Sequence, residues 1–143
     1  MIRPRRSLLF MPGSNARALE KARNLPADGI ILDLEDSVAP EAKAVARDQI
    51  AKAIAAGGFG RREVLIRVNA LDTPWWIDDI DMAGKARPDG ILVPKVSSAQ
   101  DLTTIADRLS DINADASIRV WAMAATCTTA RLKGTSFALE GLW

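Results

Sequence analysis

Apolar residues cluster in five short runs along the chain, and each run is bounded by glycine, proline or small polar residues. Runs with such boundaries are typical of buried strands. We therefore predict strands, in chain order, at Ser7–Met11, Ile30–Glu35, Glu63–Ala70, Gly90–Val96 and Ile118–Ala125.

The stretches between these runs are richer in alanine and charged residues and carry the usual start and stop signals of helices. The predicted start signals are, in order, Ser14 or Asn15, Pro40, the pair Thr73-Pro74, and Ser97 or Ser98. The first helix is predicted to end near Asn24, the second at Gly57-Gly58 and the fourth near Asn113. Strands that alternate with helices indicate a parallel sheet with right-handed crossovers. Either an open doubly wound sheet or part of a (β/α) barrel fits this order, and both carry function at the carboxyl ends of the strands.

Polar side chains gather toward those carboxyl ends, on one face of each strand. By alternation, the shared faces are Ile31, Asp33 and Glu35; Leu65, Arg67 and Asn69; Ile91, Val93 and Lys95; and Trp121, Met123 and Ala125. The opposite faces are apolar. This distribution favours a barrel interior over an open sheet, because an open sheet has helices on both faces. We expect Arg67 and Lys95 to face Asp33 and Glu35 across the barrel mouth.

The second strand ends in three carboxylates, Asp33, Glu35 and Asp36. Desolvation of a charge costs several kcal/mol, so these groups require either a wet cleft or cationic partners. Two simpler interpretations stay open, namely a solvated strand–loop junction and a buried ion network that only closes the barrel. The turn Pro12-Gly13-Ser14-Asn15 either holds a phosphate or is a plain turn.

Composition limits the remaining possibilities. The 143 residues form one domain of ordinary soluble composition, and the net charge of +1 gives no general attraction to nucleic acid or to an anionic membrane. We predict a cytoplasmic protein with no membrane span. The single cysteine, Cys127, excludes an internal disulfide. The absence of histidine excludes Ser-His-Asp and Cys-His catalysis, so any chemistry rests on carboxylates, lysine, arginine, backbone amides or a hard metal ion.

Four segments resemble the HpcH/HpaI aldolase and citrate lyase β-subunit family: SLLFMPGSNARALEKA, GIILDLEDSVAPEAKAVAR, LIRVNALDTPW and DGILVPKVSS. The resemblance runs from about Arg6 to Met123. It implies an α/β fold that is part of a TIM (β/α)8 barrel, with about the first five strands and four helices. It also implies a homo-oligomeric, Mg²⁺-dependent carbon–carbon lyase. Such a lyase acts on 3-hydroxyacyl thioesters of CoA or of an acyl carrier, such as citryl-, malyl- or citramalyl-CoA.

The same resemblance assigns roles to residues. It implies that Arg67 holds the substrate carboxyl or carbonyl oxygen and stabilises the enolate, with Asn69 also in the substrate-binding set. Glu35 and Asp36 are implied to lie near the metal and its waters. From its expected place at the barrel mouth, we add Lys95 to the catalytic set of Arg67, Glu35 and Asp36.

The chain departs from the family pattern at its C-terminal end. Ala125 stands where the family has a metal-binding glutamate, and a sixth strand with a second metal-binding aspartate is missing. We expect Glu35 and Asp36 to give at most a weak, water-rich Mg²⁺ site. We expect residues 1–126 to be the N-terminal part of a barrel lyase domain and residues 127–143 a divergent tail.

A whole barrel typically needs about 250 residues, so the chain resembles a truncated, frameshifted or split lyase with impaired activity. The alternative is a non-catalytic binding or assembly module that retains half of the barrel. Either way, we expect the inward faces of Leu65, Val93, Trp121 and Met123 to lack an opposite wall and to favour association.

Overall fold

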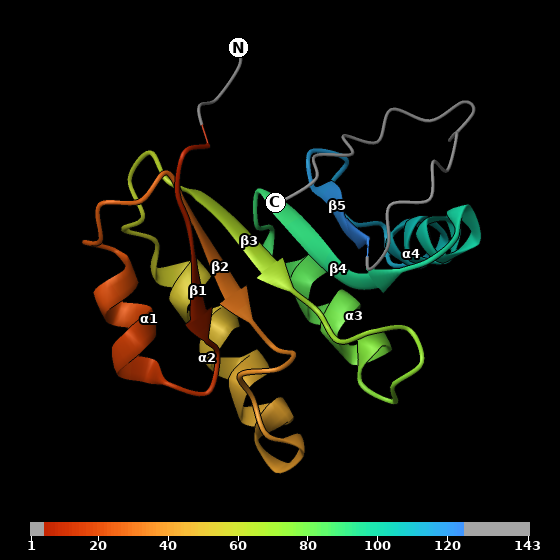
Figure 1. Ribbon diagram of the computed structural model, residues 1–143, viewed down its shortest axis with the longest axis horizontal. Helices are drawn as coiled ribbons and strands as arrows, with labels where there is room; N and C mark the ends of the chain where they lie inside the picture. Colours follow the sequence, from red (N-terminus) through yellow and green to blue (C-terminus); the bar gives the residue numbers. More distant parts are fainter. Residues whose placement is uncertain (1–4, 125–143) are drawn as a thin grey trace.

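Five parallel strands form one sheet in the order β1-β2-β3-β4-β5 (Figure 1). The computed structural model describes residues 5–124. The strands are β1 Leu8–Pro12, β2 Gly29–Asp33, β3 Glu63–Arg67, β4 Gly90–Val96 and β5 Arg119–Ala124. A doubly wound sheet reverses its strand order at a switch point. Here every strand pairs with its neighbour in sequence, so the open-sheet alternative is wrong for the described residues.

Four helices connect the strands: α1 Ala16–Ala22, α2 Lys43–Ala56, α3 Trp76–Ala86 and α4 Ala99–Asp111. One turn of 3-10 helix, Pro40–Ala42, leads into α2. No helix among residues 5–124 is long and apolar enough to cross a membrane.

The two faces of the sheet carry different cores. On one face, strand residues such as Ile30, Ile66 and Ile91 pack with Ile50 of α2 and Ile80 of α3 in the larger cluster of buried apolar side chains. On the other face, a smaller cluster consists of Ile31, Leu65, Leu92 and Trp121. Helices on one face only, with one inner side chain from each of four successive strands, define a section of a (β/α) barrel. The predicted fold, about five barrel strands and four helices, is confirmed.

The helix signals are confirmed in part. Asn15 caps α1, since its side chain accepts a hydrogen bond from the Ala18 amide, and Ser98 caps α4 in a capping box with Asp101. The predicted start of α3 at Thr73-Pro74 is wrong. The Thr73 hydroxyl donates to the Ala70 carbonyl and closes a turn, and α3 begins after Trp75 without a side-chain cap.

The predicted inward face of β4 is also wrong. Leu92 lies in the inner cluster, whereas Ile91 and Val93 face the helices. Strict alternation places Ile91, Val93 and Lys95 on one face, but the pairing of β4 with β5 shifts register between Val93 and Val96, and Lys95 has a φ of 54°. The register shift breaks the two-residue period, so Lys95 does not report the face of the residues before it.

The predictions for Ala125, Cys127 and the tail at 127–143 lie outside the described residues.

Candidate active site

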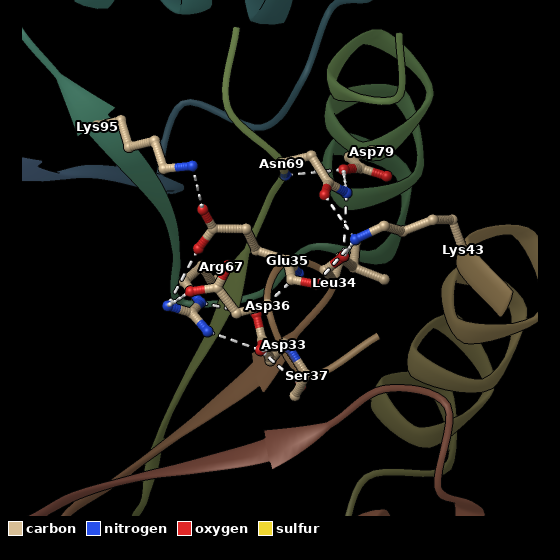
Figure 2. Close-up of polar contacts among 10 residues, drawn as sticks. All are labelled: Asp33, Leu34, Glu35, Asp36, Ser37, Lys43, Arg67, Asn69, Asp79 and Lys95. Atoms are coloured by element: carbon tan, nitrogen blue, oxygen red, sulfur yellow. Dashed lines mark hydrogen bonds and ion pairs between the residues drawn. The ribbon is translucent and has the colours of Figure 1, made fainter. Parts of the chain in front are cut away.

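The site is built on an ion pair between two neighbouring strands. Asp33 and Arg67 are the last residues of β2 and β3, and the strand register places them opposite each other. Arg67 Nε donates to Asp33 Oδ1 at 2.7 Å and Arg67 Nη2 donates to Asp33 Oδ2 at 2.7 Å (Figure 2). This two-pronged geometry fixes the plane of the guanidinium and leaves Nη1 directed away from Asp33.

Asp33 also ends its own strand. Its Oδ1 accepts the Glu35 amide at 2.9 Å, and its Oδ2 accepts the Ser37 amide at 3.1 Å and the Ser37 hydroxyl at 2.5 Å. An aspartate that binds amides a few residues ahead favours a turn over a continued strand. The predicted extension of this strand to Glu35 is therefore wrong, and Glu35 and Asp36 lie in the turn.

The many donors around Asp33 decide its charge. Burial alone would raise the pKa of Asp33, but hydrogen bonds from Arg67 and Ser37 outweigh burial and hold that pKa below its ordinary value. The pKa of Arg67 is raised, since its pairing with Asp33 outweighs the opposing effect of burial. The pair is therefore ionised on both sides.

The turn aims Glu35 at two cations. Glu35 Oε2 lies 3.1 Å from Arg67 Nη1, and Glu35 Oε1 lies 3.7 Å from Lys95 Nζ. Asp36 is exposed and its Oδ2 lies 3.9 Å from Arg67 Nη1. The expected meeting of Arg67 and Lys95 with Asp33 and Glu35 is confirmed (Figure 2).

Glu35 differs from Asp33 in the direction of its pKa shift. Burial raises the pKa of Glu35 and the neighbouring carboxylates of Asp36 and Asp33 add to that effect, while Arg67 and Lys95 oppose it. A carboxyl group with a raised pKa exchanges protons more readily near neutral pH than an ordinary one. Asp33 and Glu35, two residues apart, are thus suited to different tasks.

An aromatic ring and a small cavity lie next to two residues of the site. The ring of Phe10, on β1, lies 4.6 Å from the Arg67 guanidinium carbon. A cavity of about 180 Å³ opens beside Lys95, between the loops that follow β3 and β4, and Asp72, Ser97 and Asp101 are among its lining residues. Sequence reasoning did not single out Phe10, because an aromatic residue in a strand is ordinarily a packing residue.

Asn69 does not lie with Arg67. The prediction that the two share a strand face is wrong, because β3 ends at Arg67 and Asn69 turns toward the helices. Its side-chain oxygen accepts from Lys43 Nζ at 2.7 Å, and its side-chain nitrogen donates to Asp79 Oδ2 at 2.7 Å (Figure 2). The assignment of Asn69 to substrate binding stays a prediction.

Sequence reasoning missed Lys43 and Asp79, both of which are buried. The signal for Lys43 is helical spacing, since Lys43, Ala46, Ile50 and Ala53 form the buried stripe of α2. Asp79 is similarly placed on the buried side of α3, next to Ile80.

The described residues do not fit a complete magnesium site. No group of three or more Asp, Glu, Cys or His side chains is placed to hold a metal ion within residues 5–124. Glu35 already faces two cations and Asp36 is exposed, so the pair offers few free oxygens for a hard cation.

The fold and the site together define a class of protein. A section of a parallel (β/α) barrel with a charged cluster at the carboxyl ends of its strands has the arrangement of barrel enzymes, whose active sites lie at that end. Comparison with known proteins then gives the family. Residues 6–132 match the family model of HpcH/HpaI aldolase/citrate lyase, and the chain belongs to that family.

Two curated relatives come from Cereibacter sphaeroides. The chain is 46% identical over 123 residues to a (3S)-malyl-CoA thioesterase, covering 86% of this chain and 41% of the relative. It is 46% identical over 107 residues to an L-malyl-CoA/β-methylmalyl-CoA lyase, covering 72% of this chain and 33% of that relative. The chain therefore spans less than half the length of these relatives.

A solved structure is also similar to this chain over about half of its own length. The citrate lyase β subunit of Mycobacterium tuberculosis, complexed with oxaloacetate and magnesium, is similar with a TM-score of 0.66 and 28% identity. The similarity covers 84% of this chain and 47% of that one.

Proposed function

We propose that this chain carries the arginine-based part of the active site of a carbon–carbon lyase for 3-hydroxyacyl-CoA thioesters of the malyl-CoA type. The observation that supports the proposal is the geometry of Arg67. Asp33 occupies Nε and Nη2, while Nη1 faces Glu35 at the carboxyl end of the sheet. The identity to malyl-CoA enzymes supports this choice of substrate class.

The reaction requires positive charge at a defined place. When the bond between C2 and C3 of malyl-CoA breaks, its electrons move to the thioester carbonyl and form an enolate, and the 3-hydroxyl loses its proton as glyoxylate forms. Protonation of the enolate at C2 then gives acetyl-CoA. We assign stabilisation of the enolate oxygen to Arg67 Nη1, with Lys95 as a second cation at the mouth.

Glu35 is the proposed proton carrier. In the free site its carboxylate faces Arg67 Nη1 and Lys95 Nζ, so a substrate oxygen arriving at these cations takes the place of Glu35. Released from both cations, Glu35 is left with burial and its acidic neighbours, which favour the protonated form. We propose that Glu35 accepts the hydroxyl proton and then returns it to C2 of the enolate, and that Asp36 holds water at the rim.

Magnesium belongs to the related citrate lyase β-subunit complex, and no step above is routed through it. The described residues supply only part of the ligands that a hard cation requires.

Thioester hydrolysis is the second candidate, since the relative that matches over 86% of the chain is named a thioesterase. In that reaction water attacks the thioester carbonyl, and the same two cations stabilise the tetrahedral oxyanion. A non-catalytic module that binds the thioester is the alternative from another class.

One incubation separates these functions. The purified chain is mixed with malyl-CoA, and the products are resolved by liquid chromatography with mass detection. Acetyl-CoA with glyoxylate supports the lyase, and malate with free CoA supports the thioesterase. Intact malyl-CoA that binds to the parent but not to Arg67→Lys supports the binding module. Intact malyl-CoA with no measurable binding contradicts all three proposals.

A further inference from the structure

A lysine ammonium lies buried behind the site, outside the set of residues that the proposed reaction uses. Lys43 is only 5% exposed, at the start of α2. Its Nζ donates to three oxygens, the Leu34 carbonyl at 2.6 Å, the Glu35 carbonyl at 2.8 Å and Asn69 Oδ1 at 2.7 Å. These are as many acceptors as an ammonium group can serve.

The choice of lysine at this position is costly for the fold. Burial lowers the pKa of Lys43, and none of the carboxylates in the described part of the chain lies at ion-pair distance from it. A buried charge without an ionic partner loses several kcal/mol of hydration, and an apolar side chain in a helix stripe does not. Its hydrogen bonds therefore point to a specific task.

The atoms that Lys43 binds indicate this task. The carbonyls of Leu34 and Glu35 belong to the turn that carries Glu35 and Asp36 toward Arg67 (Figure 2). Lys43 holds both carbonyls on the helix side of the turn. The Glu35 side chain consequently stays on the opposite side, toward the mouth of the barrel.

The ammonium is itself held from several directions. Asn69 donates to the Leu34 carbonyl at 3.0 Å and to Asp79 Oδ2 at 2.7 Å, and Asp79 Oδ1 accepts from Arg47 Nη1 at 2.9 Å. The ring of Trp75 lies 5.1 Å from Lys43 Nζ. The turn is thus tied to both α2 and α3, and its position follows the helix layer.

We propose that Lys43 is a positioning residue that fixes the turn at Leu34–Ser37 and thereby sets the distance between Glu35 and Arg67. Asp33 holds this turn from the strand side, and Lys43 holds it from the helix side. The effect on turnover rests on the proposed function, whereas the effect on the turn does not.

Amide hydrogen exchange in the full chain tests the structural part without any substrate. In Lys43→Met, the Glu35 and Ser37 amides lose about tenfold or more of their protection, which corresponds to about 1.4 kcal/mol of local opening. The protection of the Ile66 amide, in the middle of β3, changes only as much as the free energy of global unfolding changes. The Arg67 Nε–H resonance shifts in the same spectra, since its acceptor Asp33 also binds this turn.

Two matched variants separate positioning from general destabilisation. Lys52→Met removes an exposed lysine from the same helix and leaves all of these signals unchanged. Ile50→Val weakens the core under α2 and lowers protection uniformly in proportion to global stability. If Lys43→Met behaves like either control, the proposal is overturned. If Lys43→Met does not melt cooperatively, Lys43→Gln replaces it, and the same local pattern is expected at smaller amplitude.

Turnover of malyl-CoA tests the functional part. Lys43→Met is expected to lower kcat at least tenfold with less than threefold change in KM, since the thioester still binds while Glu35 is displaced. Unchanged kcat with exposed turn amides shows that the turn need not be fixed and overturns the functional part. If the parent itself gives no products, the proposed function fails, and hydrogen exchange still decides whether Lys43 positions the turn.

Discussion

Among single residues, Asp33 connects Arg67 to the turn that carries Glu35. Its carboxylate accepts hydrogen bonds both from the Arg67 guanidinium and from the amides of that turn. The sequence alone supported this interpretation as far as the meeting of opposite charges, since strand ends in a parallel sheet lie at one edge. It did not reveal the turn, because the hydrogen bonds that the Asp33 carboxylate accepts from the Glu35 and Ser37 amides leave no periodic signal in the sequence. The contacts of Lys43 and Asp79 were hidden for a similar reason, since a polar residue within a helix is ordinarily exposed.

Replacement of Arg67 by lysine is expected to weaken anion binding by about 10- to 100-fold. Lysine keeps the charge but cannot bind Asp33 with two parallel bonds while offering a third donor to the ligand, and a hydrogen bond to a charged group is worth about 1.5–3 kcal/mol. Calorimetry with oxaloacetate and with malyl-CoA measures the change. Arg61→Lys, at an exposed position, serves as the control. Equal affinities in parent and Arg67→Lys contradict the assigned role.

Stability at acid pH is expected to depend on Asp33. Because the folded-state pKa of Asp33 lies below its ordinary value of 3.8, its interactions stabilise the fold above that value and are lost as the pH falls through the folded-state pKa. Urea unfolding between about pH 5 and pH 2 should show a steeper loss of stability in the parent than in Asp33→Asn.

Ser37→Ala sharpens this comparison, since it removes one donor to Asp33 and moves the acid loss to higher pH. Asp33→Asn itself is expected to lose about 1.5–3 kcal/mol at neutral pH, because Arg67 loses its two-pronged carboxylate partner and keeps only the contacts of Nη1 with Glu35 and Asp36. Parallel pH profiles for parent and Asp33→Asn argue against an ionised pair.

Magnesium is expected to bind weakly to the chain. The described carboxylates form no three-membered cluster, and the family resemblance predicts a glutamate at the position of Ala125. Ala125→Glu should strengthen binding in a calorimetric titration with MgCl₂. Equal, weak binding in both forms counts against the alignment of Ala125 with that glutamate, and tight binding by the parent indicates a site built from other residues.

At the scale of elements, hydrophobic period and turn chemistry predicted all five strands and four helices of the described region. The errors in boundaries and faces have local structural causes. Asp33 ends β2 early, Thr73 closes a turn that delays α3, and the irregular pairing before Val96 reverses the expected face of β4. Each of these depends on a specific hydrogen bond or register shift, which residue type alone does not specify.

The irregular end of β4 makes a measurable prediction. Lys95 has a positive φ, a conformation that costs a residue with a Cβ about 1–2 kcal/mol and costs glycine almost nothing. Lys95→Gly should therefore be more stable than Lys95→Ala by about 1 kcal/mol in urea unfolding, although both lose the ion pair with Glu35. A more stable alanine variant shows that the backbone at this position is not strained.

For the whole molecule, the expected open inner wall is wrong for Leu65 and Trp121, which are 0% and 4% exposed. These side chains pack with Ile31 and Leu92, and the Arg5 guanidinium lies 4.7 Å from the Trp121 ring. The prediction is also wrong for Val93, which faces the helices. The exposed large apolar side chains among the described residues are instead Leu9 and Phe10 of β1, at 37% and 42%, together with Val45 of α2 and Ile77 of α3.

We still predict that the chain associates through the outer edges of its sheet. Within residues 5–124, β1 and β5 each pair with one neighbour, so their outer edges present unpaired backbone groups. Light scattering coupled to size-exclusion chromatography should show oligomers, and Phe10→Lys should reduce the oligomeric fraction. Deletion of residues 126–143 tests whether the C-terminal stretch affects this association. A sharp monomer peak with cooperative melting, unchanged by this deletion, indicates that the five-strand unit is self-sufficient.

The sequential strand order has a consequence for synthesis on the ribosome. Each described strand pairs with the strand that precedes it in the sequence, and one helix connects the two. No pairing among these strands requires a segment that is synthesised later than the second strand of the pair. Such sequential topology allows the strands to pair in the order of translation. We therefore expect Asp33 and Arg67 to be able to pair before β4 is made, and Lys95 to be the last cation that joins the cluster.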